Sequence, residues 1–122
     1  MTTIRYLVKD MQIAITFYTS LLDFEIAEQW GSAFASVTRK DLTLWLSGPE
    51  TSAAKPMPDD SIPQPGGWNR FVLVVGNLDA LVGKLREAGS EFRSDILEGP
   101  GGRQILINDP SGNPFELFEP AD

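Results

Sequence analysis

The chain contains neither cysteine nor histidine. Without cysteine it has no disulfide bond, no thiolate metal ligand and no cysteine nucleophile, which fits a reducing compartment such as the cytoplasm. Without histidine it also lacks imidazole ligands and the general base of Ser-His-Asp and Cys-His sites. Together these absences exclude hydrolases of the Ser-His-Asp and Cys-His types and every metal centre built on imidazole or thiolate ligands.

Long apolar runs and positive charge are also scarce. No stretch of about 18 apolar residues occurs and no basic stretch precedes an apolar one at the start, so we expect no membrane span, no signal peptide and a cytoplasmic location. The net charge is -7, from 10 Lys and Arg against 17 Asp and Glu. Such a surface repels phosphate backbones and anionic membranes, so we expect no nucleic-acid partner and a weak preference for cationic ligands.

What the chain does contain fits one globular domain over residues 1–122. Apolar residues make up 42% and charged residues 22%, near ordinary globular values. A chain of 122 residues is long enough to bury roughly two-thirds of the surface that its unfolded form exposes.

Residues 1–47 form a first module of one strand, one helix and three strands. Ile4–Val8 is a short apolar strand, Asp10 stands where a helix N-cap belongs, and apolar residues recur at helical spacing over residues 11–22. The three later strands are expected near Phe24–Gln29, Ala33–Thr38 and Leu42–Leu46. In the last of these, leucine alternates with other residues, so we expect Trp45 to point away from the core.

Residues 48–67 form a linker or loop that holds five of the nine prolines. The pattern then begins again over residues 68–122. We expect a strand at Trp68–Val75, a helix that starts after the N-cap Asn77 and ends at Gly89, and strands at Phe92–Leu97, Arg103–Ile107 and Pro114–Phe118.

The two modules align element by element. Matching the caps Asp10 and Asn77 gives an offset of 67, and matching Trp45 with Glu116 gives 71, so a few loop residues account for the difference. Two copies are too few for a repeat array, so we expect a pseudo-twofold domain.

Motifs in both modules resemble a known family. Val8-Lys9-Asp10, then Ala14, Phe17-Tyr18 and Leu21-Leu22-Asp23-Phe24, resemble the V-x-D, A-x-x-F-Y and L-G-F signature of the vicinal oxygen chelate superfamily, with Asp23 in place of glycine. Residues 109–117, DPSGNPFEL, are similar to its ending D-P-D-G-N-x-x-E-L. That superfamily includes glyoxalase I, extradiol dioxygenases, and fosfomycin and bleomycin resistance proteins. The resemblance implies an α+β fold in which two βαβββ modules form a glyoxalase-like cup, with the helices packed behind the sheet and the site inside.

Members with metal chemistry place ligands at the start of each module's first strand and in its last strand. These positions fall on Thr3 and Trp45 in the first module, and on Arg70 and Glu116 in the second. Only Glu116 is a good metal ligand, and an arginine cation would repel a divalent ion, so we expect no metal and no cofactor. We expect Arg70 and Glu116 to form a charge-assisted pair, with the guanidinium replacing the charge of the metal.

The residues predicted to bind a ligand in the cup are Thr3, Arg5, Leu7, Trp45, Arg70, Val72, Arg103, Glu116 and Phe118. Trp45 either stacks against an aromatic compound or fills the cup. Glu116 is either a general base or an ion-paired relic of the fold. Arg103 stands where many relatives have an arginine, or is a solvated hairpin residue.

Several functions follow from the resemblance. The first is a metal-independent protein that sequesters a cationic or aromatic small molecule, as in the bleomycin resistance branch. The second is a glyoxalase-type lyase or isomerase acting on a small oxygenated substrate, with Glu116 as proton shuttle and Arg70 or Arg5 as oxyanion partner. A third is a subunit that only pairs with another protein. Relatives of this size are generally homodimers, which implies a homodimer here, with each cup formed by one chain or shared by both.

Overall fold

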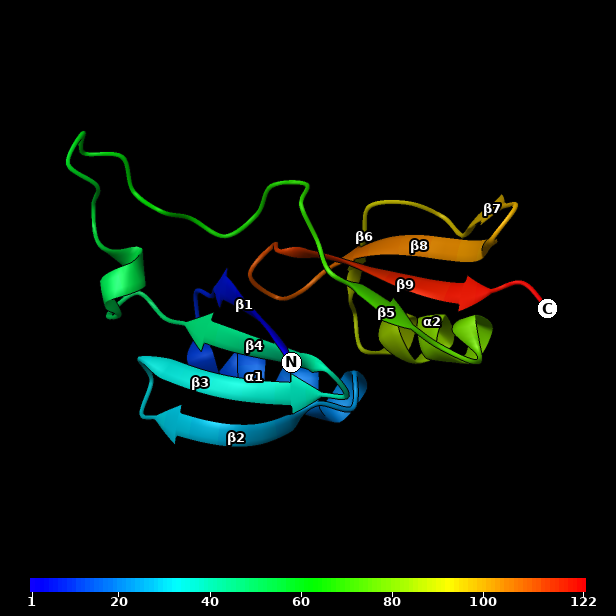
Figure 1. Cartoon of the computed structure of the whole chain (residues 1–122), viewed down its shortest axis with the longest axis horizontal. Coiled ribbons are helices and arrows are strands. Elements are labelled where there is room, and N and C mark those ends of the chain that lie inside the picture. Colours follow the sequence, from blue (N-terminus) through cyan, green and yellow to red (C-terminus); the bar gives the residue numbers. More distant parts are fainter. The chain divides into compact units, whose positions relative to one another are not determined.

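The computed structural model describes residues 1–122. The chain divides into two compact units, Met1–Pro65 and Gly66–Asp122, and each is described by itself. Each unit contains one α-helix and one sheet, in the same order along the chain (Figure 1). The α+β fold of two βαβββ modules is therefore confirmed, whereas the joining of the two sheets into a cup stays a prediction.

The first unit has a sheet of four strands in the order β1-β4-β3-β2. Its elements are β1 (Thr2–Leu7), α1 (Met11–Leu21), β2 (Glu25–Trp30), β3 (Phe34–Arg39), β4 (Leu42–Ser47) and the 3-10 turn η1 (Ser52–Ala54). β1 runs parallel to β4, and β3 is antiparallel to both of its neighbours.

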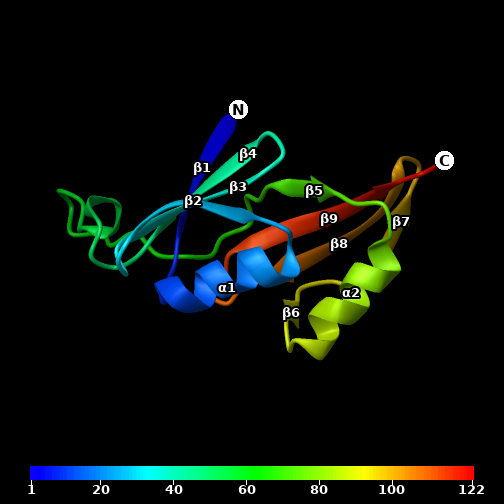
Figure 2. The same ribbon diagram turned by 90° about the horizontal axis from the view of Figure 1, so that it is seen from below.

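Helix α1 begins at the predicted N-cap. The Asp10 carboxylate accepts a hydrogen bond from the Ile13 N–H at 2.9 Å, which satisfies one of the otherwise unpaired N–H groups of the first turn. The buried face of α1 includes Ala14, Ile15 and Tyr18, and the sheet side chains Val37, Leu44 and Leu46 are fully buried. This helix covers one face of the sheet only (Figure 2).

The second unit repeats this arrangement with the sheet order β5-β9-β8-β6, and with β7 paired to β8. Its elements are β5 (Val72–Val74), α2 (Leu78–Glu87), β6 (Glu91–Phe92), β7 (Leu97–Gly99), β8 (Gly102–Asn108) and β9 (Pro114–Pro120). The core holds fully buried side chains of the sheet and of α2, which are Ile105, Ile107, Phe115, Leu117, Leu78 and Leu85. Neither α-helix of the chain is long and apolar enough to cross a membrane.

The strand registers confirm the alignment of the two modules. In the first unit Arg5 lies opposite Trp45, and in the second Val72 lies opposite Glu116. These pairs differ by 72 − 5 = 67 and 116 − 45 = 71, the two offsets expected from the caps and the last strands. Trp45 and Glu116 are therefore equivalent positions, and so are Thr3 and Arg70.

The predicted strand Phe92–Leu97 is wrong as a single element. Four residues, 93–96, lie opposite only two, 105 and 106, so pairing stops at Phe92 and resumes at Leu97. In the gap a side chain replaces a backbone acceptor, because the Ser94 hydroxyl accepts a hydrogen bond from the Leu106 N–H at 3.0 Å.

The predicted strand Trp68–Val75 is shortened to Val72–Val74. The Glu116 N–H donates to the Phe71 carbonyl at 3.0 Å, but two residues earlier β9 begins with Pro114, which has no N–H to continue the ladder. The segment before β5 is held by side chains instead. Asn113 Oδ1 accepts from the Gly66 N–H at 2.9 Å, and Arg93 donates to the Gly67 carbonyl at 2.6 Å.

Candidate functional site

The face of the first sheet that is turned away from α1 carries four of the predicted residues, which are Thr3, Arg5, Leu7 and Trp45. Their neighbours of opposite parity, Leu44 and Leu46, are fully buried, whereas the Trp45 side chain is 39% exposed. The prediction that Trp45 points away from the core is therefore confirmed. Paired residues of a sheet point to the same side, so Arg5 lies beside Trp45 on this face.

Arg5 is held against Trp45 in a cation–π arrangement. Its guanidinium carbon lies 5.1 Å from the centre of the Trp45 ring, and its Nη1 donates to the Ser47 hydroxyl at 3.0 Å. Both contacts are with neutral groups, so the positive charge of Arg5 is oriented without being neutralised.

Two further aromatic residues extend this face and were not among the predicted site residues. The Phe34 ring lies 5.9 Å from the Trp45 ring, and the Trp30 ring lies 5.4 Å from the Phe34 ring. Strand alternation in β3 could have indicated Phe34. Trp30 could not be placed in this way, because β2 shifts its register between Ile26 and Glu28. We call Trp30, Phe34 and Trp45 the aromatic row.

The corresponding face of the second sheet carries an ion pair. Arg70 donates from Nε and Nη2 to Oε1 of Glu116, at 3.2 and 3.0 Å. Only 12% of the Glu116 side chain is exposed, against 31% of Arg70. The predicted Arg70–Glu116 pair is therefore confirmed, at the positions equivalent to Thr3 and Trp45.

Apolar side chains surround this pair. Val72 and Leu106 lie opposite Glu116 in the neighbouring strands, and Phe118 lies two residues further along β9 on the same face. Val72 is 49% exposed. Four of the predicted residues, Arg70, Val72, Glu116 and Phe118, thus lie together on the face that is turned away from α2.

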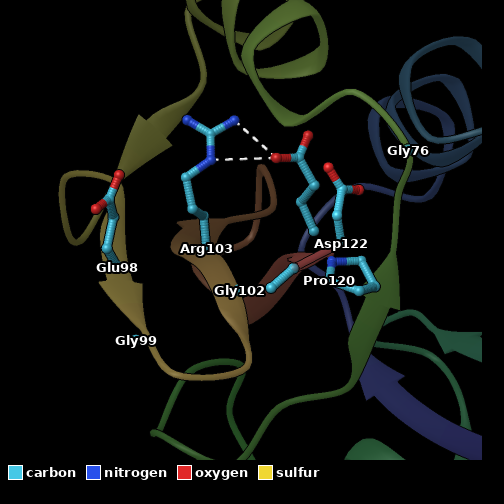
Figure 3. Close-up of a pocket in the computed structure, with 9 residues that line it drawn as sticks. Gly76, Glu98, Gly99, Gly102, Arg103, Pro120 and Asp122 are labelled. Atoms are coloured by element: carbon cyan, nitrogen blue, oxygen red, sulfur yellow. Dashed lines mark hydrogen bonds and ion pairs between the residues drawn. The ribbon is translucent and has the colours of Figure 1, made fainter.

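The remaining predicted residue, Arg103, lies elsewhere. It shares the side of β8 with the buried Ile105 and reaches the start of α2, where it donates to Asp79 at 2.9 Å and to Glu119 at 2.8 Å. Figure 3 shows Arg103 in the lining of a pocket, together with Glu98 and Asp122. The Leu78 N–H at the start of α2 also donates to Glu119, at 2.9 Å. Arg103 is therefore apart from Glu116 and from the open face of its sheet, because side-chain parity in β8 places odd-numbered residues on the helix side.

These contacts shift the pKa values of Arg103 and of its two carboxylate partners. Hydrogen bonding to Arg103 lowers the pKa of Asp79, while the Leu78 N–H and then Arg103 lower the pKa of Glu119. The same carboxylates, Asp79 first, raise the pKa of Arg103. A cavity of about 470 Å³ adjoins the group, with Glu98, Gly102, Arg103 and Glu119 among its lining residues. Arg103 forms ion pairs with Asp79 in α2 and with Glu119 in β9, so its role is to hold the start of α2 against β9. We call these three residues the Arg103 clamp.

The four positions that hold metal in relatives do not fit a metal ion here. They carry a threonine hydroxyl, an indole, a guanidinium and one carboxylate, and Glu116 is already bound by Arg70. The structure contains no group of three or more Asp or Glu side chains arranged to hold an ion. A divalent cation needs several converging oxygen or nitrogen donors, which this set does not supply.

Comparison with known proteins gives one family and a common fold. The family model described as Glyoxalase/Bleomycin resistance protein/Dioxygenase superfamily matches residues 1–117. No curated protein matches the chain.

Among solved structures, the antibiotic binding protein TnmS3 from Streptomyces sp. CB03234 is 27% identical, with a TM-score of 0.72 over 98% of this chain and 93% of that one. A superfamily member from Sphaerobacter thermophilus DSM 20745 is 26% identical, with a TM-score of 0.75 over 96% and 94%. The fosfomycin resistance protein FosX from Listeria monocytogenes, at 16% identity and a TM-score of 0.75 over 99% and 93%, shares the fold.

Proposed function

Since the chain belongs to the glyoxalase/bleomycin resistance protein/dioxygenase superfamily, we propose that it binds and sequesters a small molecule without a metal ion. The observation that carries this proposal is the aromatic row, with Trp45 and Trp30 exposed at 39% and 67% on the open face of the first sheet. Exposed aromatic rings beside a few polar groups are typical of small-molecule sites. The likeness to the antibiotic binding protein TnmS3 supports the same reading.

Metal independence is supported by the donor set. The equivalent positions Thr3, Trp45 and Arg70 offer no strong metal ligand. The carboxylate of Glu116, at the fourth position, is already ion-paired with Arg70. The site therefore binds through stacking and hydrogen bonds.

One observation favours an enzyme as the second candidate. Both hydrogen bonds from Arg70 end on Oε1 of Glu116, in a mostly buried setting, so Oε2 is the oxygen that would accept a proton from a substrate. In that case Arg70 would stabilise the negative charge that forms, as in a glyoxalase-type isomerase or lyase. A homodimer, a cytoplasmic location and a role in antibiotic resistance are further parts of the proposal.

A binding assay with two tryptophan variants tests the proposal. Thermal shift and titration calorimetry would use bleomycin, doxorubicin and the hemithioacetal of glutathione and methylglyoxal. We expect at least one antibiotic to raise Tm and to be recovered unchanged by chromatography. Trp45→Ala should weaken binding, whereas Trp68→Ala, which removes an indole that is 69% exposed in the second unit, should not.

The assay also separates the candidates. Conversion of the hemithioacetal to a thioester in the presence of a chelator, abolished by Glu116→Gln, would favour the enzyme and contradict sequestration. Binding that Trp45→Ala leaves unchanged would contradict the role of the aromatic row.

A further inference from the structure

One transverse row of side chains on the open face of the first sheet has unlike charges at its two ends. Arg5 in β1 lies opposite Trp45 in β4, Trp45 lies opposite Ser36 in β3, and Ser36 lies opposite Glu28 in β2. All four side chains point to the same side, because paired residues in a sheet share a face. The order across the sheet is therefore guanidinium, indole, hydroxyl and carboxylate.

The spacing of strands gives the length of this row. Three steps between neighbouring strands, each about 4.8 Å, separate the backbone at Arg5 from that at Glu28 by roughly 14 Å. Roughly three fused aromatic rings fit between the two charged ends of such a row.

The middle of the row offers a flat surface for a ligand, with aromatic rings along one side. Ser36 is small and 7% exposed, so a ligand can lie over it between the larger side chains of Trp45 and Glu28. Phe34 is two residues from Ser36 on the same side of β3, and its ring contacts both Trp45 and Trp30. An aromatic ligand placed over Ser36 would contact the rings of the aromatic row along one side.

The charges at the two ends are not neutralised within the protein. Arg70 and Arg103 are paired with carboxylates, but neither Arg5 nor Glu28 takes part in an ion pair. Arg5 and Glu28 are both exposed on the face that carries the aromatic row. A ligand that lies along the row thus meets a positive group at one end and a negative group at the other.

We infer that this face binds a flat, fused-ring aromatic molecule that carries an acidic oxygen at its Arg5 end and a protonated amine at its Glu28 end. The inference rests on the proposed function and adds the chemical class and the orientation of the ligand. Arg5 supplies charge-assisted N–H donors for the oxygen, and Glu28 supplies an acceptor for the ammonium group.

Two planar probes that each carry one of the charges test this orientation. They are anthraquinone-2-sulfonate, which is anionic, and 9-aminoacridine, which is cationic, with binding followed by calorimetry at low salt. We expect Arg5→Gln to weaken binding of the sulfonate about fivefold and to leave the acridine unchanged, since charge-assisted contacts on an exposed face are modest. Glu28→Gln should weaken binding of the acridine about fivefold and leave the sulfonate unchanged.

Matched controls use charges outside the row. Asp41→Asn removes an exposed carboxylate from the turn between β3 and β4, and Arg39→Gln removes a guanidinium from the end of β3, so neither should change the affinity of either probe. Circular dichroism of each variant checks that the fold is retained.

The outcomes distinguish this inference from the proposed function. Equal effects of Arg5→Gln and Glu28→Gln on both probes, or no effect on either, would overturn the orientation. If the protein binds bleomycin but neither planar probe, the ligand class is wrong and the proposed function stands. If it binds none of these compounds, both are wrong.

Discussion

Arg70 directs two N–H groups, from Nε and Nη2, at the same oxygen of Glu116, at 3.2 and 3.0 Å. In metal-dependent relatives the equivalent positions hold ligands that share one cation, and here one partner carries the positive charge itself. This salt bridge balances the negative charge of the Glu116 carboxylate, which is mostly buried among apolar side chains.

Removing the positive partner should destabilise the second unit. We expect Arg70→Gln to lower the free energy of unfolding by about 1–2 kcal/mol, because it leaves the Glu116 carboxylate without its charged donor. The double variant Arg70→Gln with Glu116→Gln should recover part of that loss, which urea denaturation of the two would measure. Lys84→Gln, at an exposed position of α2, is the surface control, with a change within about 0.5 kcal/mol. An unchanged free energy in Arg70→Gln would show that the pair contributes nothing.

Divalent metal ions should not stabilise the folded protein. Binding to the native state alone would add about 2.7 kcal/mol at a metal concentration 100 times Kd. We expect no rise in Tm with Mn²⁺, Ni²⁺, Co²⁺ or Zn²⁺, and no loss of ligand binding after treatment with EDTA. A rise in Tm with one of these ions, abolished by Glu116→Gln, would contradict the argument from the donor set.

The Arg103 clamp should make stability depend on pH in the acid range. The pKa values of Asp79 and Glu119 are lowered in the folded protein, so these carboxylates stabilise it above their unfolded values of about 3.9 and 4.3. That stability is lost as the pH falls through the folded pKa values. We expect the free energy of unfolding to decrease below about pH 5, and the decrease to be smaller in Arg103→Gln.

The free energy of unfolding of the original chain should exceed that of Arg103→Gln most near neutral pH, and the two values should converge at acid pH. Urea unfolding at a series of pH values measures both. Lys84→Gln removes an exposed cation of α2 that forms none of these ion pairs, so this variant should retain the acid dependence of the original chain. Parallel curves for Arg103→Gln and the original chain would be evidence against the clamp.

The N-cap of α1 is a separate test of local structure. Asp10→Ala removes the acceptor for the Ile13 N–H and should lower stability by about 1 kcal/mol. Asp10→Asn keeps an acceptor oxygen and should cost little, which thermal unfolding of both variants would measure. Equal losses in the two variants would assign the effect to charge rather than to capping.

The expected homodimer can be checked directly. Sedimentation equilibrium at micromolar concentrations should give twice the mass of one 13.4 kDa chain. A mass of one chain over the whole concentration range would contradict the prediction and would place any cup within a single chain.

Much of the fold was predictable because it depends on short-range patterns. The caps Asp10 and Asn77, the leucine alternation around Trp45 and the equivalence of Arg70 with Thr3 all follow from residue type and spacing. The pairing of Arg70 with Glu116 was predictable from the family resemblance, which places both residues at positions that share one metal ion in relatives.

The sequence by itself thus determined the two helices, the repeated order of elements and the residues at the positions that hold metal in relatives. Only the tertiary structure decided which residues meet across strands. The register shift in β2 places Trp30 and Glu28 on the face of Trp45. The Ser94 hydroxyl, and not a backbone carbonyl, accepts the hydrogen bond from the Leu106 N–H. Arg103 forms an ion pair with Asp79 at the start of α2. The physical reason is that such contacts depend on a one-residue register or on a distant side chain, and neither leaves a local periodic pattern.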